Sequence, residues 1–326
     1  MALLGSKLLN SAYLYNPNMK KILLIISICS VLFACDLREQ IIDLPYDGET
    51  PKLSIIASFR PADTIIAYIN RSQWLHEYAT LPDVESIQPY SIKVSVYEDS
   101  ILLDTLSRLR LPNNCCYDYW KSASGKKPQA GHSYYFVVSA DGFETIYNTP
   151  VRVPEPVPLN TSFTIVDSIG IYEGDSGPDV NQIVSSLSFS FDDPANQKNY
   201  YNCTIYAYNA DGVDLALAAP LNNVMGCKTG DMGSLFNDEC FNGQTAQINI
   251  PVRSFFGDFK LRDAAYISIK LHSLSYEQYR FYETYVDQPF LVEDVLFREP
   301  YNTYSNIQNG YGIVTASSFN ELVIYP

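Results

Sequence analysis

Apolar and polar residues alternate in short runs along most of the chain. In residues 91–97, Ile92, Val94 and Val96 alternate with serine and lysine, which gives a strand one apolar face and one polar face. Comparable β-branched or aromatic runs, separated by turn residues, occupy residues 52–57, 64–69, 133–138, 185–191, 202–208, 244–250 and 266–271. This period of two predicts an all-β protein.

A proline-rich segment divides these runs into two groups. Pro154, Pro156 and Pro158 fix backbone φ angles and remove donors from any β-ladder, so residues 154–160 are predicted to form an extended linker. Residues 52–153 before it predict a β-sandwich of the immunoglobulin or fibronectin type, and residues 161–326 after it predict a second, larger β-sandwich.

One segment of the second group has a helical period. Ser275 and Gln278 have the spacing of a capping box, and Tyr276, Tyr279 and Tyr282 lie on one side of a helix. Aromatic residues at this spacing usually face a core. The pattern therefore predicts one short helix that closes the second sandwich.

Residues 19–34 have the three regions of a signal peptide. Two lysines precede an apolar run at residues 22–33, which is too short to span a membrane. The run ends in Leu32-Phe33-Ala34-Cys35, which resembles a bacterial lipobox, so Cys35 is predicted to carry the lipid that anchors the mature protein. An ordinary cleaved signal peptide and a short core helix are the alternatives.

The segments on either side of this signal have different roles. Residues 1–18 precede the lysines that should open a signal peptide, and we interpret them as a leader that is not translated, with synthesis starting at Met19. Residues 35–51 are rich in acidic and turn residues and are predicted to be an acidic tether between the lipid and the body.

Charge and composition narrow the range of partners. The chain has 22 Lys and Arg residues against 36 Asp and Glu residues, a formal net charge of -14. Such a body offers no basic surface for phosphates, so nucleic acid is not an expected partner. With 47% hydrophobic residues over 326 positions the chain can fill a globular core, which excludes a disordered protein.

Five cysteines follow the lipobox. Cys227 and Cys240 flank a loop rich in Gly, Asn and Asp, and a disulfide between them would stabilise the fold by about 3 kcal/mol. Cys115 and Cys116 are adjacent and would pair with each other only under strain, so one of them either bridges Cys203 or stays free. None of the five has the spacing of a zinc site.

A glycine-rich stretch, Gly174-Asp175-Ser176-Gly177-Pro178, is similar to the nucleophile loop of chymotrypsin-like proteases. It lacks one glycine of that loop, and His272 follows Ser176, which is the wrong order for that fold. The same residues are common in flexible turns, which is the interpretation that we favour. We therefore predict no catalytic residue and a protein that is not an enzyme, with a cryptic hydrolase as the remote alternative.

The same loop contains oxygen ligands of the kind that Ca2+ prefers. Glu173, Asp175, Asp179 and Asn181 cluster within it. Their spacing is not that of an EF-hand, and a solvated acidic turn is the competing interpretation. No other metal and no organic cofactor is expected.

Two loops rich in aromatic residues suggest different roles. Tyr117, Tyr119 and Trp120 lie between two predicted turns with little strand length to bury them, so we expect them to bind a partner and not to join the core. A later loop combines turn residues with Phe236 and Phe241, which predicts a folded loop whose phenylalanines close the end of the second sandwich.

An ordered set of short motifs is similar to those of a known family. The motifs are Asp43-Leu44-Pro45, Gly131-His132-Ser133-Tyr134, Ala140-Asp141-Gly142, Val153-Pro154-Glu155-Pro156-Val157-Pro158, Phe191-Asp192-Asp193-Pro194, Asn199-Tyr200-Tyr201, Leu235-Phe236-Asn237-Asp238, Phe241-Asn242-Gly243, Ser305-Asn306-Ile307 and Gly310-Tyr311-Gly312-Ile313. Together they resemble the domain-of-unknown-function family 4249, lipoproteins of gram-negative bacteria whose genes often neighbour those of TonB-dependent outer-membrane transporters. The resemblance implies an outer-membrane location and a barrel transporter as partner. The leader and the cysteines after the lipobox depart from it.

These observations together predict a non-enzymatic accessory or ligand-binding protein. Lipid on Cys35 would hold it at the outer membrane, on the periplasmic or the cell-surface face, beside a TonB-dependent transporter. A surface adhesin or an outer-membrane assembly scaffold is the alternative function.

Overall fold

The computed structural model describes most of the chain after residue 49. The described residues are 50–72, 91–110, 118–172, 180–212, 214, 216–218, 223–229, 234–254, 260–286 and 303–326. Within them the structure consists of strands, one α-helix and one 3-10 turn, which confirms the prediction of an all-β protein with a short helix. Residues Pro51–Pro326 form one compact unit. No helix in these ranges is long and apolar enough to cross a membrane.

The described strands form three sheets. The largest contains β1 (Leu53–Phe59), β2 (Ile66–Arg71), β3 (Lys93–Glu98), β4 (Ile101–Arg110), β5 (Asp118–Ser122), β6 (Ser133–Ser139), β7 (Ile146–Asn148), β8 (Val151–Arg152), β11 (Tyr200–Tyr208), β15 (Leu235–Asn237), β17 (Tyr266–Leu274), β18 (Ile307–Gln308) and β19 (Tyr311–Ile324). The second contains β9 (Leu159–Tyr172), β10 (Val180–Asp192), β12 (Ala216–Ala218) and β16 (Thr245–Ser254). The third is the pair β13 (Asn223–Val224) and β14 (Cys227–Lys228), and the helical elements are η3 (Leu261–Asp263) and α3 (Tyr276–Val286).

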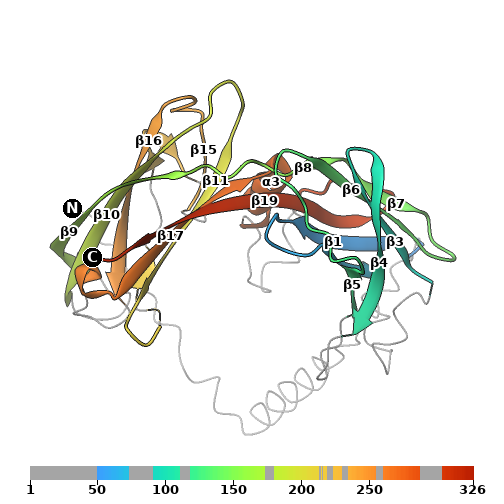
Figure 1. The fold of residues 1–326 in the computed structure, drawn as a ribbon, viewed down its shortest axis with the longest axis horizontal. Coiled ribbons are helices and arrows are strands. Elements are labelled where there is room, and N and C mark those ends of the chain that lie inside the picture. Colours follow the sequence, from blue (N-terminus) through green and yellow to red (C-terminus); the bar gives the residue numbers. More distant parts are fainter. Residues whose placement is uncertain are drawn as a thin grey trace, which may run out of the picture. The chain divides into compact units, whose positions relative to one another are not determined.

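Strand β19 joins strands from both halves of the chain into one ladder. The large sheet has the order β15-β11-β17-β19-β1-β2-β5-β4-β3-β6-β7-β18, and β8 pairs with β6. β19 pairs antiparallel with β17 from Ser317 to Ile324 and parallel with β1 from Tyr311 to Ala316. Figure 1 shows β19 as the long strand beside β17 at one end and β1 at the other.

Two residues of the C-terminal motifs make close contacts along β19. Gly312 has a φ of +110°, and a Cβ atom at this position would overlap the backbone oxygen of Ile55. Buried Asn306 acts like a strand neighbour, because its Nδ2 donates to the Val314 oxygen at 2.8 Å and its Oδ1 accepts from the Val314 nitrogen at 3.0 Å. These residue types are therefore explained by the fold.

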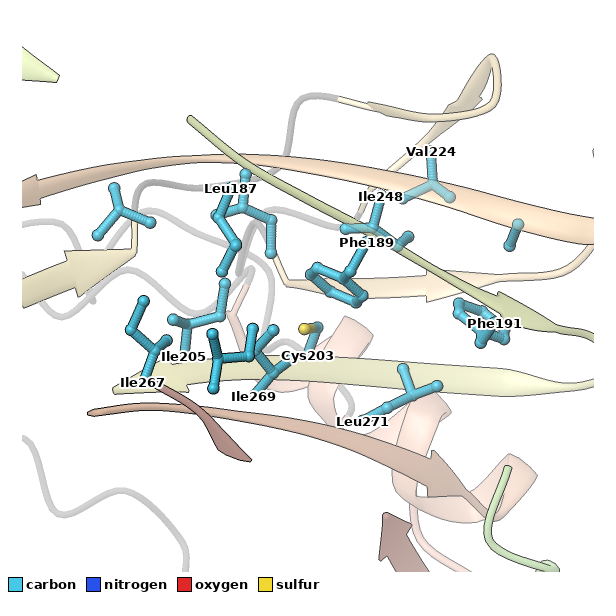
Figure 2. Packing of buried hydrophobic residues seen from close by; sticks show 14 of the residues in the cluster. Leu187, Phe189, Phe191, Cys203, Ile205, Val224, Ile248, Ile267, Ile269 and Leu271 are labelled. Atoms are coloured by element: carbon cyan, nitrogen blue, oxygen red, sulfur yellow. The ribbon is translucent and has the colours of Figure 1, made fainter. Parts of the chain in front are cut away.

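The C-terminal core lies between the four-stranded sheet and strands β11 and β17. Figure 2 shows Leu187 and Phe189 of β10 facing Cys203 and Ile205 of β11 and Ile269 of β17. In β11 and in β17 up to Leu271 the apolar positions alternate with polar ones, so that the apolar face of these strands is buried against the four-stranded sheet. This two-layer packing is the second β-sandwich that the sequence predicts.

The N-terminal core is enclosed by strands that follow one another in the large sheet. The Phe59 ring stacks on the Phe136 ring with centroids 4.9 Å apart, and Trp120 and Tyr134 are buried beside them. Val314 of β19 belongs to the same core. The N-terminal strands therefore form one curled ladder that is completed by the end of the chain.

The proline-rich segment connects these two cores. Residues 153–158 have no regular secondary structure, as their prolines require. Val153 is buried in the N-terminal core and Val157 in the C-terminal core. The predicted boundary at residues 154–160 stays a prediction, because strand β19 contributes side chains to both cores.

The predicted helix forms, and its cap fastens it to β19. Ser275 Oγ accepts from the Gln278 backbone nitrogen at 3.3 Å and from the Ala316 nitrogen at 3.2 Å, and the Ser275 nitrogen donates to the Ala316 oxygen at 2.8 Å. The expectation that the tyrosine side faces a core is wrong for Tyr276, which is 48% exposed, whereas Tyr279 and Tyr282 are half-buried and Gln278 is only 6% exposed. The helix therefore buries a polar side chain against the sheet.

Candidate functional site

The site beside helix α3 begins on the face of the large sheet that points away from the C-terminal core. Because Cys203 and Ile205 of β11 face that core, Asn202 and Thr204, which alternate with them along the strand, face the other way. In the β-ladder Asn202 lies opposite His272 of β17, and His272 lies opposite Phe319 of β19. Polar side chains from neighbouring strands are therefore side by side on this face.

Helix α3 and the turn after β1 convert this face into a cavity, which we call the α3 pocket. Its volume is about 420 Å3, and its lining includes Arg60, Asn202, Thr204, His272, Gln278 and Phe319. This size falls in the range of about 300–1,000 Å3 that is usual for small-molecule sites. The Ser275 cap positions the helix that supplies Gln278, so the pocket depends on the contact between α3 and β19.

Several residues that line the α3 pocket have a buried polar atom without a hydrogen-bond partner among the described residues. Asn202 Oδ1, Thr204 Oγ1 and Gln278 Oε1 are buried, and none is bonded to any atom of the described residues. Gln278 Nε2 donates to Tyr282 Oη at 3.2 Å, which fixes the amide and leaves its oxygen unpaired. A buried polar atom without a partner costs about 1–3 kcal/mol. Three residues that line this one pocket carry such an atom.

Three charged or titratable groups that line the α3 pocket, His272, Arg60 and Asp63, together carry little net charge. Burial lowers the pKa of the His272 imidazole, and the positive charges of Arg60 and Lys270 lower it further, so the ring is neutral at neutral pH. The Arg60 guanidinium lies 3.9 Å from the Asp63 carboxylate. The His272 ring also lies 5.5 Å from the ring of Phe319, which is 41% exposed. The pocket therefore combines uncharged polar groups and one pair of opposite charges with an aromatic surface.

A second cavity shares a wall with the α3 pocket. It has a volume of about 800 Å3 and is lined in part by the aromatic residues Tyr68, Phe281, Tyr282, Tyr304 and Tyr311. Gln278 and Tyr282 line both cavities. We call this second cavity the aromatic pocket, and its lining suits an apolar or ring-bearing group.

The expected exposure of Trp120 is wrong. Its side chain is 2% exposed and lies in the N-terminal core, because Asp118–Ser122 form strand β5 and not a loop. Trp120 pairs with Ala67 of β2, and the alternation of the strand then directs Trp120 inward. Tyr119 is half-buried, with its ring 6.4 Å from the Tyr68 ring, and Tyr117 lies outside the described residues. A partner role for Tyr119 and Tyr117 stays a prediction.

Most other candidate residues lie outside the described part of the chain. These are Cys35, Cys115, Cys116, Glu173, Asp175, Ser176 and Asp179. The backbone of Asn181 lies in β10, but its side chain and that of Cys227 are outside the described part. The signal peptide, the tether and the calcium site therefore stay predictions.

The structure decides part of the cysteine question. Cys203 is a free, buried thiol, so the alternative in which it bridges Cys115 or Cys116 is wrong. Burial raises the pKa of the Cys203 thiol to about 12, which makes it inert as a nucleophile. Cys240 is disulfide-bonded, and its pairing with Cys227 stays a prediction.

The predicted folded loop is confirmed, and it covers a buried acidic network that the sequence did not reveal. Phe236 and Phe241 are both buried in the C-terminal core. Asp193 Oδ1 accepts from Tyr201 Oη at 2.5 Å, and Asp193 Oδ2 accepts from a loop nitrogen at 2.9 Å. Asp238 Oδ2 accepts from a backbone nitrogen at 2.9 Å. Burial raises the pKa of Asp238, and the charge of Asp193 raises it further.

This network has a structural role. Asn199 Nδ2 donates to Asp193 Oδ1 at 3.3 Å and to Asp238 Oδ2 at 3.2 Å, which joins the two carboxylates. The side chains come from three of the short motifs that also carry the family resemblance. Their hydrogen bonds hold the turn between β10 and β11 against the loop that follows β15. The motifs are therefore explained by packing at this end of the sandwich.

Comparison with known proteins gives one family. A family model described as "Domain of unknown function (DUF4249)" matches residues 38–322. No curated protein matches the chain. Among solved structures, a marsupial T cell receptor aligns at 9% sequence identity with a TM-score of 0.20, over 69% of this chain and 59% of that chain.

Proposed function

The chain belongs to the DUF4249 family, and from this premise we propose that it is a non-enzymatic ligand-binding protein that works at the outer membrane. In this proposal lipid on Cys35 anchors the protein, and the body serves as an accessory component of a TonB-dependent transporter. The α3 pocket is the part of the body that takes the ligand.

The unpaired polar atoms of the α3 pocket carry the binding part of this proposal. A fold gains nothing from burying Asn202 Oδ1, Thr204 Oγ1 and Gln278 Oε1 without partners in the described residues, since each costs free energy. A ligand that pairs with them recovers this free energy on binding. Atoms that lower the stability of the free protein can in this way strengthen its binding of a ligand.

The arrangement favours binding over catalysis. A nucleophilic hydroxyl is normally hydrogen-bonded to its general base. Thr204 Oγ1 and Ser318 Oγ line the same pocket as His272, yet neither has a partner in the described part of the chain. His272 is therefore not placed as the base of either hydroxyl.

Affinity purification from native membranes tests the location and the partner. The wild-type chain should fractionate with membranes and retain a barrel transporter, whereas Cys35→Ser should lose acyl labelling and be released. If both chains partition alike, the lipid anchor is wrong. If the anchored wild type retains no barrel protein, the accessory role is wrong.

A row of exposed and half-buried tyrosines favours the second candidate, a surface adhesin or assembly scaffold. The rings of Tyr208 and Tyr266 stack with centroids 4.7 Å apart, and Tyr206 and Tyr325 extend the row on either side. Tyr325 is 76% exposed. Tyrosine is a frequent anchor in protein interfaces. Capture of a matrix protein in the absence of any barrel protein would support this candidate.

A further inference from the structure

We infer that the α3 pocket binds a neutral, hydroxyl-rich small molecule of the sugar or polyol class, whose hydroxyl groups donate to Asn202 Oδ1 and Gln278 Oε1. This inference rests on the binding function proposed above and specifies its ligand. The argument has three parts: the hydrogen-bonding capacity of the pocket, its charge and its aromatic surface.

The unpaired atoms define what the ligand must offer. Asn202 Oδ1 and Gln278 Oε1 are amide oxygens, which can only accept hydrogen bonds. Thr204 Oγ1 can either donate or accept. A ligand that satisfies all three therefore needs at least two donors and benefits from a group that does both. Neighbouring hydroxyl groups on one small ring or chain meet this requirement.

Charge excludes the main competing ligand classes. A carboxylate or phosphate would bring negative charge against two amide oxygens and against Asp63, which also lines the pocket, and the Arg60 guanidinium in the lining already faces Asp63 at 3.9 Å. Protein sites for metal ions normally combine several carboxylate, thiolate or imidazole ligands with any amide oxygens that take part. In the described ranges no group of three or more His, Cys, Asp or Glu side chains converges in this way. A neutral ligand remains.

The aromatic surface provides a face on which an apolar side of the ligand can lie. Phe319 is partly exposed in the pocket, and the Tyr282 side chain forms another part of the wall. Sites of this kind place most of the ligand against apolar and aromatic groups and fix its orientation with a few polar atoms. A pyranose or an inositol has hydroxyl edges and less polar faces, which matches this division.

The test uses the full chain, purified from membranes in a detergent that has no sugar head group. The probes are D-glucose, D-galactose, D-mannose and myo-inositol, each beside its fully O-methylated counterpart, which keeps the ring but has no hydroxyl donor. Binding is measured by calorimetry and by saturation-transfer NMR. We expect at least one probe to bind and its methylated counterpart to bind at least about tenfold more weakly.

Two variants locate the binding in the α3 pocket. Gln278→Met and Thr204→Val remove pocket oxygens at nearly constant volume and should each weaken the probe by about tenfold. Thr245→Val is the matched control, since Thr245 Oγ1 donates to Asp192 at 2.7 Å in an exposed pair outside the lining of the pocket. The control should bind the probe as the wild type does.

Three results would overturn the inference. The first is that no probe of the panel binds to a chain that still retains its barrel partner, in which case the ligand class fails and the accessory role stands. The second is equal binding of a probe and its methylated counterpart. The third is tight binding of inorganic phosphate or citrate that Thr204→Val abolishes. Loss of the barrel partner with sugar binding intact would instead refute the proposed accessory role alone.

Discussion

Replacing Thr204 by valine should make the protein more stable. Thr204 lies in the middle of β11, opposite Lys270 of β17, and its Oγ1 is buried with no partner in the described residues. Valine has the same shape and an equal or higher preference for strands. The substitution removes an unsatisfied polar atom and breaks no hydrogen bond that the described residues make. We therefore expect the free energy of unfolding to rise by about 1 kcal/mol.

The measurement is thermal and chemical unfolding of the full chain without added ligand. A gain of about 1 kcal/mol corresponds to a rise in Tm of about 2–4 °C for a body of this size. The matched control is Thr284→Val in helix α3, because Thr284 Oγ1 donates to the Arg280 oxygen at 2.9 Å and accepts from the Tyr304 nitrogen at 2.9 Å. This control should lower Tm.

The reasoning is refuted if Thr204→Val lowers Tm as Thr284→Val does. That result would mean that the Thr204 hydroxyl already has a partner in the folded protein, and the case for a ligand at this atom would fail. A stabilised variant with weaker sugar binding would show that Thr204 serves recognition at the expense of stability.

Three further predictions concern other parts of the fold. Trp120→Ala should lower the free energy of unfolding by about 3–5 kcal/mol, measured by chemical denaturation, and an unchanged value would contradict its burial. Burial and the charge of Asp193 raise the pKa of Asp238, so the Asp238 carboxyl group holds its proton more tightly in the folded state than in the unfolded state. Protonated Asp238 therefore stabilises the fold at low pH, and this contribution is lost as the pH rises through the raised pKa. Asp238→Asn should remove that part of the pH dependence, and unchanged pH curves would contradict it. Gly312→Ala should lower Tm more than Gly142→Ala, because both have positive φ but only the first would place a Cβ atom against backbone; equal losses would contradict the close approach.

Local patterns predicted the elements of the fold well. The alternation of Ile92, Val94 and Val96 correctly indicated a strand, and the spacing of Ser275 and Gln278 correctly indicated a helix start. In both cases the signal lies within a few residues of the element that it predicts. Side-chain spacing along one strand or helix is enough to identify such an element.

Features that depend on distant contacts were not predictable in this way. Tyr119 and Trp120 are adjacent aromatic residues, so the alternation alone does not say which one faces the core, and pairing with β2 decides it. Asn202, Thr204 and Gln278 are ordinary polar residues in the sequence. They become a site only because the Ser275 cap holds helix α3 against Ala316 of β19. No short-range pattern contains that contact.

The sharing of β19 between both cores has a consequence for how the protein folds. Ser54 of β1 pairs with Tyr311, so nearly all of the described chain must be synthesised before β1 gains this neighbour. Until then the backbone N–H and C=O groups along one edge of β1 are unpaired, and such an edge can pair with a strand of another chain. Contacts of such long sequence separation slow folding and lengthen this exposure. Chaperone protection of the Leu53–Phe59 edge is therefore most needed before β19 arrives, and truncation within β19 should cause aggregation and not simply a loss of binding.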